Sequence, residues 1–232
     1  MLSSSLIQSI GETPLVELPS FSSKPGVRIF AKLEGSNPTG SVKDRIARAM
    51  IQAALDDGSL DSSRIVLEPT SGNTGISLAM ITSRLGYRFT AVMPDNVSPE
   101  RSELLRAYGA EIIYSPGEEG SNGSIAMAKD IVAKDSSYLM LFQYGNAANP
   151  EIIRDLPDIT HFVAGLGTGG TLMGTGRRLK EYNPKIEIIA AAPEPDDRIQ
   201  GLRSLEEGFV PPILDLKMLD SRIMVSGEES FR

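Results

Sequence analysis

The sequence predicts an α/β fold with parallel sheets, because short strand-like runs alternate with amphipathic helical stretches along the chain. The expected strands, rich in β-branched and apolar residues, are 28–33, 64–68, 89–93, 111–114, 138–142, 159–165 and 186–191. The expected helices, which show helical periodicity, are 42–57, 74–85, 99–108, 121–134 and 170–182. Parallel sheets bind ligands beyond the C-terminal ends of their strands, so the loops from strand to helix are where a site is expected.

Local signals explain several of these boundaries. Gly58, Gly86 and Gly109 each follow a helical stretch and suit a left-handed helix end. Pro99 follows Ser98, which suits a capping residue with proline at the first helical position.

Composition excludes several classes of function. The chain has 232 residues, of which 41% are hydrophobic, enough for one large domain or two small ones. A net charge of −7 disfavours nucleic acid and anionic membranes as partners. The chain has no cysteine, which fits a cytoplasmic protein, and its one histidine, His161, rules out a multi-histidine metal site within a single chain. His161 lies in an apolar run and is expected to be a structural strand residue.

The first strand-to-helix loop, Asn37–Arg45, contains a lysine in an unusual place. A proline and a glycine suit the turn, and Ser41 suits a helix cap. Lys43 then falls in the first helical turn, where the positive end of the helix dipole disfavours a cation and favours a neutral, nucleophilic amine. The alternative is a solvated lysine whose charge Asp44 balances.

The second loop, Glu68–Gly75, is rich in small polar groups. Its hydroxyl, amide and glycine residues are Thr70, Ser71, Gly72, Asn73 and Thr74. Such groups at a helix N-terminus suit an anion, either a carboxylate or a phosphate. The alternative is a well-capped turn without a ligand.

The third loop, Gly165–Thr171, is glycine-rich, as expected where backbone approaches a ligand closely. Three of its glycines formally match the dinucleotide fingerprint, and Glu187 lies at about the right distance beyond them. Thr168 and Thr171 add hydroxyl donors that suit a monophosphate. Tight helix–strand packing is the alternative reading.

The three loops together favour a phosphorylated aldehyde cofactor. Such a cofactor uses a lysine for an imine, a cradle for its phosphate and a second cradle for the carboxylate of an amino acid. A nicotinamide-dependent dehydrogenase would leave Lys43 and the Thr70–Thr74 loop without a role and is less favoured.

These motifs resemble those of the fold-type II pyridoxal-phosphate family, with the fold of the tryptophan synthase β chain, and are most similar to cysteine synthases. The similarity covers nearly the whole chain and includes Gly11–Val16, Asn37–Arg45, Thr70–Gly75, Phe142–Asn146 and Gly167–Thr171. It implies two three-layer α/β domains with mostly parallel sheets around a cleft. The smaller, mobile domain would comprise residues 38–145, and the larger, cofactor-phosphate-binding domain residues 1–37 plus 146–232.

The resemblance also implies a role for each matching residue. Lys43 would hold pyridoxal 5'-phosphate as a Schiff base and act as the catalytic base, while Asn73 would bond the ring oxygen of the cofactor. The cofactor phosphate would be bound by Gly167, Thr168, Gly169, Gly170 and Thr171. The substrate carboxylate would be bound by Thr70, Ser71, Gly72, Asn73, Thr74 and Gln143. No metal is implied.

The implied activity is a β-replacement that forms L-cysteine from O-acetylserine or O-phosphoserine, through an aminoacrylate intermediate. Residues 202–211 resemble a subgroup of actinobacterial enzymes that favours O-phosphoserine and takes sulfur from a small carrier protein. The arginine that matches Arg203 binds the substrate phosphate there, as a planar guanidinium can. The alternative is that Arg203 pairs with Glu206 or Glu207. Sulfide or a sulfur-carrier protein is thus the expected partner of a homodimer.

Two departures from the family pattern accompany this resemblance. Pro150 runs directly into Glu151, where the family has a short extra segment, and the chain ends before the family's last helices, which contact the pyridine nitrogen. We expect both segments to belong to the natural protein. A cystathionine β-synthase, a serine/threonine dehydratase and a catalytically silent binding module of the same fold remain the alternatives.

Overall fold

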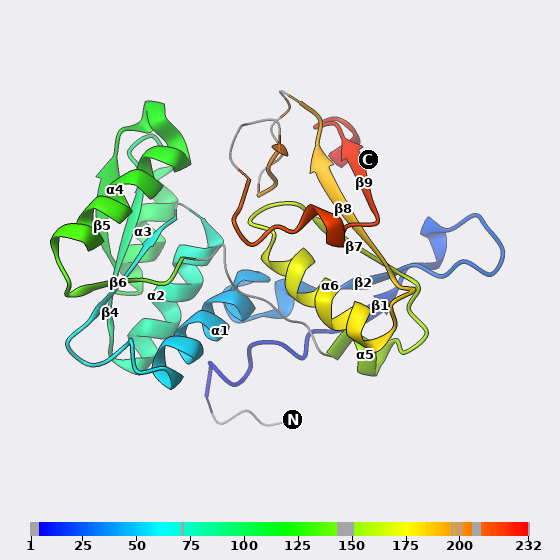
Figure 1. Cartoon of the computed structure of the whole chain (residues 1–232), viewed down its shortest axis with the longest axis horizontal. Coiled ribbons are helices and arrows are strands. Elements are labelled where there is room, and N and C mark those ends of the chain that lie inside the picture. Colours follow the sequence, from blue (N-terminus) through cyan, green and yellow to red (C-terminus); the bar gives the residue numbers. More distant parts are fainter. Residues whose placement is uncertain are drawn as a thin grey trace. The chain divides into compact units, whose positions relative to one another are not determined.

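The predicted α/β class with mostly parallel sheets is confirmed in the computed structural model, which describes residues 5–70, 72–142, 151–195, 197, 199, 201–205 and 210–231. The chain divides into two units, Met1–Gln143 and Tyr144–Arg232, and each contains strands that alternate with helices (Figure 1). The grouping of residues 1–37 with residues 146–232, and the mobility of the smaller domain, stay predictions.

The first unit contains two sheets. Its strands are β1 Leu15–Glu17, β2 Phe30–Lys32, β3 Ile65–Pro69, β4 Arg88–Pro94, β5 Glu111–Ser115 and β6 Tyr138–Met140. Its helices are α1 Lys43–Asp56, α2 Asn73–Leu85, α3 Pro99–Ala107 and α4 Gly120–Lys134. Strands β1 and β2 pair antiparallel, whereas the larger sheet has the order β5-β4-β3-β6 and is parallel throughout.

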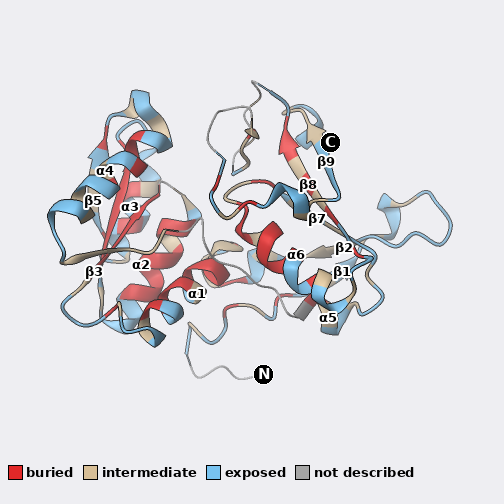
Figure 2. Cartoon of the chain, viewed as in Figure 1, coloured by how far each residue is buried: buried red, intermediate tan, exposed pale blue. Residues whose placement is uncertain are grey.

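The parallel sheet is covered on both faces, so the first unit has three layers (Figure 2). Helices α1 and α2 pack on one face against Phe89, Ala91 and Met93 of β4. Successive strand residues point to opposite faces, and Val92 accordingly packs with Ala128 of α4 on the other side. Strands β3 and β4 are buried from both sides, and most of their residues are accordingly apolar.

The second unit contains one sheet of parallel strands in the order β7-β8-β9. Its elements are α5 Glu151–Asp155, β7 His161–Gly165, α6 Gly170–Tyr182, β8 Glu187–Pro193 and β9 Ser221–Val225. Leu172, Met173 and Leu179 of α6 pack with Ile188, Ala190 and Ala192 of β8. This packing fixes the start of α6 at the carboxyl end of β7.

Three elements were not predicted, namely β1, α5 and β9. Strands β1 and β9 are short and mostly exposed, so they lack the apolar run that identifies a buried strand. The expected strands at 28–33 and 138–142 are each reduced to three paired residues, because the pairing with β1 and with β3 extends no further. None of the helices within the described ranges is long and apolar enough to cross a membrane.

The hydroxyl of Thr90 predicts a stability change that can be measured. Thr90 of β4 is 0% exposed, and its Oγ1 has no hydrogen-bond partner among the described residues. Replacement by valine keeps the β-branched shape and removes an unpaired polar atom, so Thr90→Val should raise the free energy of unfolding by about 1 kcal/mol.

Urea unfolding of Thr90→Val beside Thr82→Val checks this expectation. The Thr82 hydroxyl is also buried but donates to the Leu78 carbonyl at 2.7 Å. Thr82→Val should therefore lower the free energy of unfolding by about 1 kcal/mol. Equal destabilisation in the two variants would contradict the reading of Thr90.

Candidate active site

Residues 37–42 form a tight turn that leads into α1. The Gly40 N–H donates to the Asn37 carbonyl at 2.8 Å, and Gly40 has a φ of 79°, a left-handed conformation that costs glycine little. The Ser41 hydroxyl accepts from the Lys43 N–H at 3.2 Å. Ser41 thus satisfies one donor at the helix start, although the helix itself begins at Lys43.

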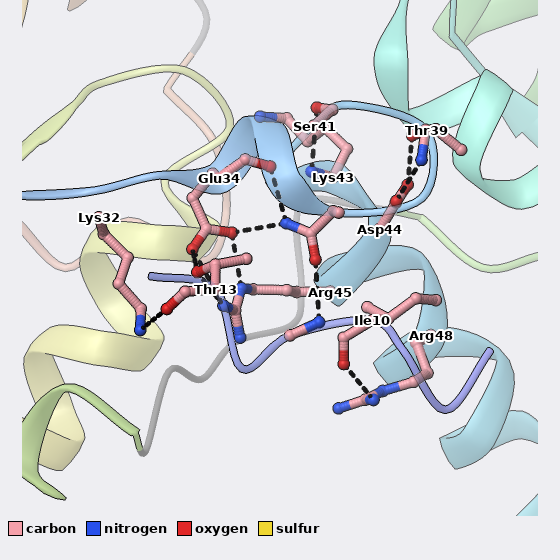
Figure 3. A network of polar contacts seen from close by, with 12 residues as sticks. Ile10, Thr13, Lys32, Glu34, Thr39, Ser41, Lys43, Asp44, Arg45 and Arg48 are labelled. Carbon is pink, nitrogen blue, oxygen red and sulfur yellow. Dashed lines mark hydrogen bonds and ion pairs between the residues drawn. The ribbon is translucent and has the colours of Figure 1, made fainter. Parts of the chain in front are cut away.

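A largely buried ion pair holds the first turn of α1 against the N-terminal segment (Figure 3). Arg45 donates from Nε to Oε2 of Glu34 at 2.7 Å and from Nη2 to Oε1 at 2.9 Å. The same carboxylate accepts from Thr13 Oγ1 at 2.7 Å and Asn37 Nδ2 at 2.9 Å, which fills its acceptor positions. Burial acts to raise the pKa of Glu34, but the bonds from Arg45, Thr13 and Asn37 outweigh it and hold the pKa below its ordinary value.

Asp44 makes a second set of contacts from the same helical turn. It is 0% exposed, and its carboxylate accepts from the Thr39 N–H at 2.8 Å, from the Thr39 hydroxyl and from the Ser77 hydroxyl at 2.5 Å. Lys43 makes no ion pair with any residue in the described ranges. The alternative in which Asp44 balances the charge of a solvated Lys43 is therefore wrong.

Lys43 has the properties of a nucleophilic amine. It is partly buried, and burial lowers the pKa of its amine below the ordinary lysine value. A lysine with a lowered pKa is neutral in a larger fraction of molecules, and only the neutral amine attacks an aldehyde.

The start of α2 lies beside the start of α1. Ser77, one helical turn after Asn73 in α2, donates to Asp44 of α1, and its Oγ also lies 2.8 Å from the Asn73 carbonyl oxygen. Asn73 is exposed, and its side-chain amide makes no hydrogen bond with the residues that the structure describes. The structure thus brings the turn of Lys43 and the turn of Asn73 together within the first unit.

Thr70 and Thr74 are placed differently from Asn73. The Thr70 Oγ1 accepts from the Gly75 N–H at 3.2 Å and from the Gly72 N–H at 3.4 Å, so its lone pairs serve the capped turn. The Thr70 hydroxyl donates no hydrogen bond to any described residue, so its proton is available to bind an anion. Thr74 is buried, and Ser71 lies outside the described residues.

The start of α6, in the second unit, carries unpaired backbone donors. Gly169 precedes the helix with a φ of 86°, and the first helical bond runs from the Met173 N–H to the Gly169 carbonyl at 2.9 Å. The Gly170 N–H has a distant contact with Thr168 Oγ1 at 3.5 Å. The N–H groups of Thr171 and Leu172 have no acceptor within the described ranges, so this helix start presents donors to an anion.

The segment that contains Arg203 lies along this turn. Arg203 donates its backbone N–H to the Leu166 carbonyl at 2.7 Å. A Cβ on Gly167 would lie 2.7 Å from the Gly201 carbonyl oxygen, so the close approach of the two segments requires glycine. Gln143, Glu206 and Glu207 lie outside the described residues.

His161 opens β7 as a strand residue with an exposed side chain. Its Nδ1 lies 2.8 Å from Thr160 Oγ1, and its Nε2 lies 3.6 Å from Glu187 Oε2 on the paired strand. These neighbours fit the predicted structural role.

Each unit presents groups of a kind that pyridoxal 5'-phosphate requires. In the first unit Lys43 offers an amine that can bond an aldehyde. In the second unit the start of α6 offers backbone N–H groups and threonine hydroxyls that can bond a phosphate. The sequence reasoning missed Thr39 and Ser77, which hold Asp44. The spacing of Thr39 before Asp44 gave a local signal, but Ser77 gave none because it lies on another element.

Comparisons with known proteins agree with this fit. Residues 6–232 match the family described as pyridoxal-phosphate dependent enzyme. A cysteine synthase of Aquifex aeolicus is 42% identical over 97% of this chain and 74% of its own length. A cysteine synthase of Staphylococcus aureus is 40% identical over 96% of this chain and 77% of its own length. The crystal structure of O-acetylserine sulfhydrylase isoform 3 from Entamoeba histolytica superposes with a TM-score of 0.90 at 31% identity, over 100% of this chain and 75% of that chain.

The lowered pKa of Glu34 predicts a dependence of stability on pH. A carboxylate with a lowered folded-state pKa contributes stability above its unfolded pKa and loses it as the pH falls through the folded value. Glu34→Gln should lower the free energy of unfolding by about 2 kcal/mol at pH 7 because it leaves Arg45 without its charge partner. The gap from wild type should begin to shrink as the pH falls below about 4.3, the ordinary pKa of glutamate, and should close as the pH falls through the lower folded-state pKa of Glu34.

Glu17→Gln is the matched control, because Arg28 binds Glu17 through the same two nitrogens, Nε and Nη2, in a solvent-exposed position. The side chains of Arg28 and Glu17 are 56% and 38% exposed, against 8% and 18% for Arg45 and Glu34. Urea unfolding at several pH values should show a much smaller effect of Glu17→Gln. A Glu34→Gln gap that is constant with pH would contradict the assignment.

Proposed function

The chain belongs to the pyridoxal-phosphate-dependent enzyme family, and within it to the cysteine synthases, and we propose that it forms L-cysteine by replacing the β-substituent of an O-substituted serine with sulfur. The observation that carries this proposal is Lys43, a partly buried amine of lowered pKa that no described carboxylate neutralises. Lys43 lies at the start of α1, next to Asp44, which accepts a hydrogen bond from Ser77 of α2, the helix that begins at Asn73.

The residues of this chain have distinct roles in the proposal. Bound pyridoxal 5'-phosphate supplies an electron sink that makes the α-proton of an amino acid acidic. Lys43 would hold the cofactor through its aldehyde carbon. Once the amino group of the substrate has displaced Lys43 from that carbon, the free Nζ would remove and return the α-proton, for which a lowered pKa is suited. Asn73 bonds the ring oxygen of the cofactor. The phosphate is bound by the turn of Gly167, Thr168, Gly169, Gly170 and Thr171.

The start of α2 is the proposed carboxylate site. The Thr70 hydroxyl proton and the Asn73 side chain are available donors in this turn. A Cβ on Gly72 would meet no atom within 4 Å, so the space beside this turn is open among the described residues. Thr74, Ser71 and Gln143 complete the set in the proposal, of which the last two lie outside the described residues.

Arg203 supports the finer proposal that the leaving group is phosphate. The backbone of Arg203 is held against the Gly165–Gly167 turn by its bond to Leu166. A guanidinium in that place can bind a phosphate through two parallel bonds. The sulfur donor is then sulfide or a sulfur-carrier protein, and the homodimer and the cytoplasmic location stay predictions.

Lys43→Ala tests the main proposal. The variant should form cysteine from O-acetylserine and sulfide at least about 100-fold more slowly than wild type, because it lacks the general base. Lys134→Ala is the control and should keep full activity, since Lys134 is 74% exposed and its ion pair among the described residues is with Asp130. A Lys43→Ala variant with full turnover would disprove the proposal. If the wild-type enzyme formed cystathionine from added homocysteine, or a keto acid, in place of cysteine, the alternatives would be favoured.

Arg203→Ala tests the choice of leaving group. The ratio of kcat/KM for O-phosphoserine to that for O-acetylserine should fall by about 10-fold or more, because a charge-assisted contact to phosphate is lost. Arg203→Lys should recover part of the ratio, since it keeps the charge but not the paired bonds. An unchanged ratio in Arg203→Ala would assign Arg203 to a structural role.

A further inference from the structure

Asp44 is a buried carboxyl group that is held in place by hydrogen bonds. It is 0% exposed and makes no ion pair with any residue in the described part of the chain. Three donors reach its carboxylate, the Thr39 N–H, the Thr39 hydroxyl and the Ser77 hydroxyl. Burying a carboxylate without a cation lowers the free energy of unfolding, and hydrogen bonds offset part of this cost. The loss of any one donor would therefore disturb the position of Asp44.

The donors of Asp44 come from two separate turns. Thr39 belongs to the loop that leads to Lys43, and Ser77 lies one helical turn after Asn73, the first residue of α2. Their hydroxyl oxygens lie 3.3 Å apart and share Oδ1 of Asp44. A serine hydroxyl has one proton, and the charge-assisted bond to Asp44 at 2.5 Å is stronger than the contact with the Asn73 carbonyl at 2.8 Å.

We propose that Asp44, held by Thr39 and Ser77, is a positioning residue that fixes the turn of Lys43 to the start of α2. The inference rests on the function proposed for Lys43. Asp44 follows Lys43 directly, so where its carboxylate is held decides where the first turn of α1 lies. Asn73 lies one helical turn before Ser77 on the same helix, so the bond that holds Ser77 to Asp44 also places Asn73. The carboxylate therefore sets the distance between the amine and the proposed carboxylate site.

The two hydroxyls allow matched variants that leave Lys43 and Asp44 unchanged. Thr39→Val removes one hydroxyl and keeps the shape, whereas Thr39→Ser keeps the hydroxyl. Ser77→Ala removes the bond to α2. Ser124→Ala is the control, because it removes a buried hydroxyl that contacts Ser115 Oγ at 2.8 Å, between α4 and β5.

The experiment measures how fast Lys43 bonds added pyridoxal 5'-phosphate in the full chain freed of cofactor. Visible absorbance gives the rate, and borohydride reduction followed by peptide mass spectrometry identifies the lysine. Thr39→Val and Ser77→Ala should slow the reaction by about 10- to 100-fold, the usual effect of a displaced reacting group. Thr39→Ser and Ser124→Ala should react within about twofold of wild type.

The outcomes separate this inference from the proposed function. If wild type does not label Lys43, the function proposed for Lys43 is wrong and the positioning role falls with it. If wild type labels Lys43 and Thr39→Val and Ser77→Ala label it equally fast, the positioning role alone is overturned. Circular dichroism melts confirm that each variant is folded at the assay temperature. If either variant is unfolded at that temperature, the labelling rate of Lys43 is compared between Thr39→Ser and Asp44→Asn instead. Equal labelling rates in these two variants would overturn the positioning role of Asp44.

Discussion

The ion pair between Arg45 and Glu34 is the constraint on which the start of α1 depends. The Glu34 carboxylate accepts four hydrogen bonds and joins the N-terminal segment, the loop before α1 and α1 itself. Successive residues of an α-helix point about 100° apart. Lys43, Asp44 and Arg45 therefore point in three directions, and Arg45 and Asp44 are each held by a different neighbour. Lys43 is left without an ion pair among the described residues, which is the condition for a reactive amine.

The same local arrangement recurs in both units. A parallel strand ends, a turn that contains glycine follows, and a helix begins with backbone donors directed outward. In the first unit side chains modify this arrangement, since Thr70 caps the turn and Ser77 ties it to α1. In the second unit the available donors are mostly backbone groups, because the N–H groups of Thr171 and Leu172 have no acceptor in the described chain. The first arrangement suits a planar carboxylate and the second a phosphate.

The phosphate turn and the Arg203 segment constrain each other. Gly167 cannot bear a side chain because the Gly201 carbonyl occupies that space, and Leu166 accepts the Arg203 N–H. A change in either segment would therefore move the other. This coupling gives a physical reason for treating the choice of leaving group and the binding of the cofactor phosphate as linked properties.

The sequence by itself determined the α/β class, the helices α1, α2, α3, α4 and α6 to within about a residue, and the turns that carry Lys43, Asn73 and Thr168. Periodicity, glycine and proline are local properties, so they can be read without knowing the fold. Only the tertiary structure decided the rest. Strands β1 and β9 exist because a distant partner pairs with them. The contact of Asp44 with Ser77 and that of Arg203 with Leu166 join residues far apart in the chain, and only packing brings such residues together.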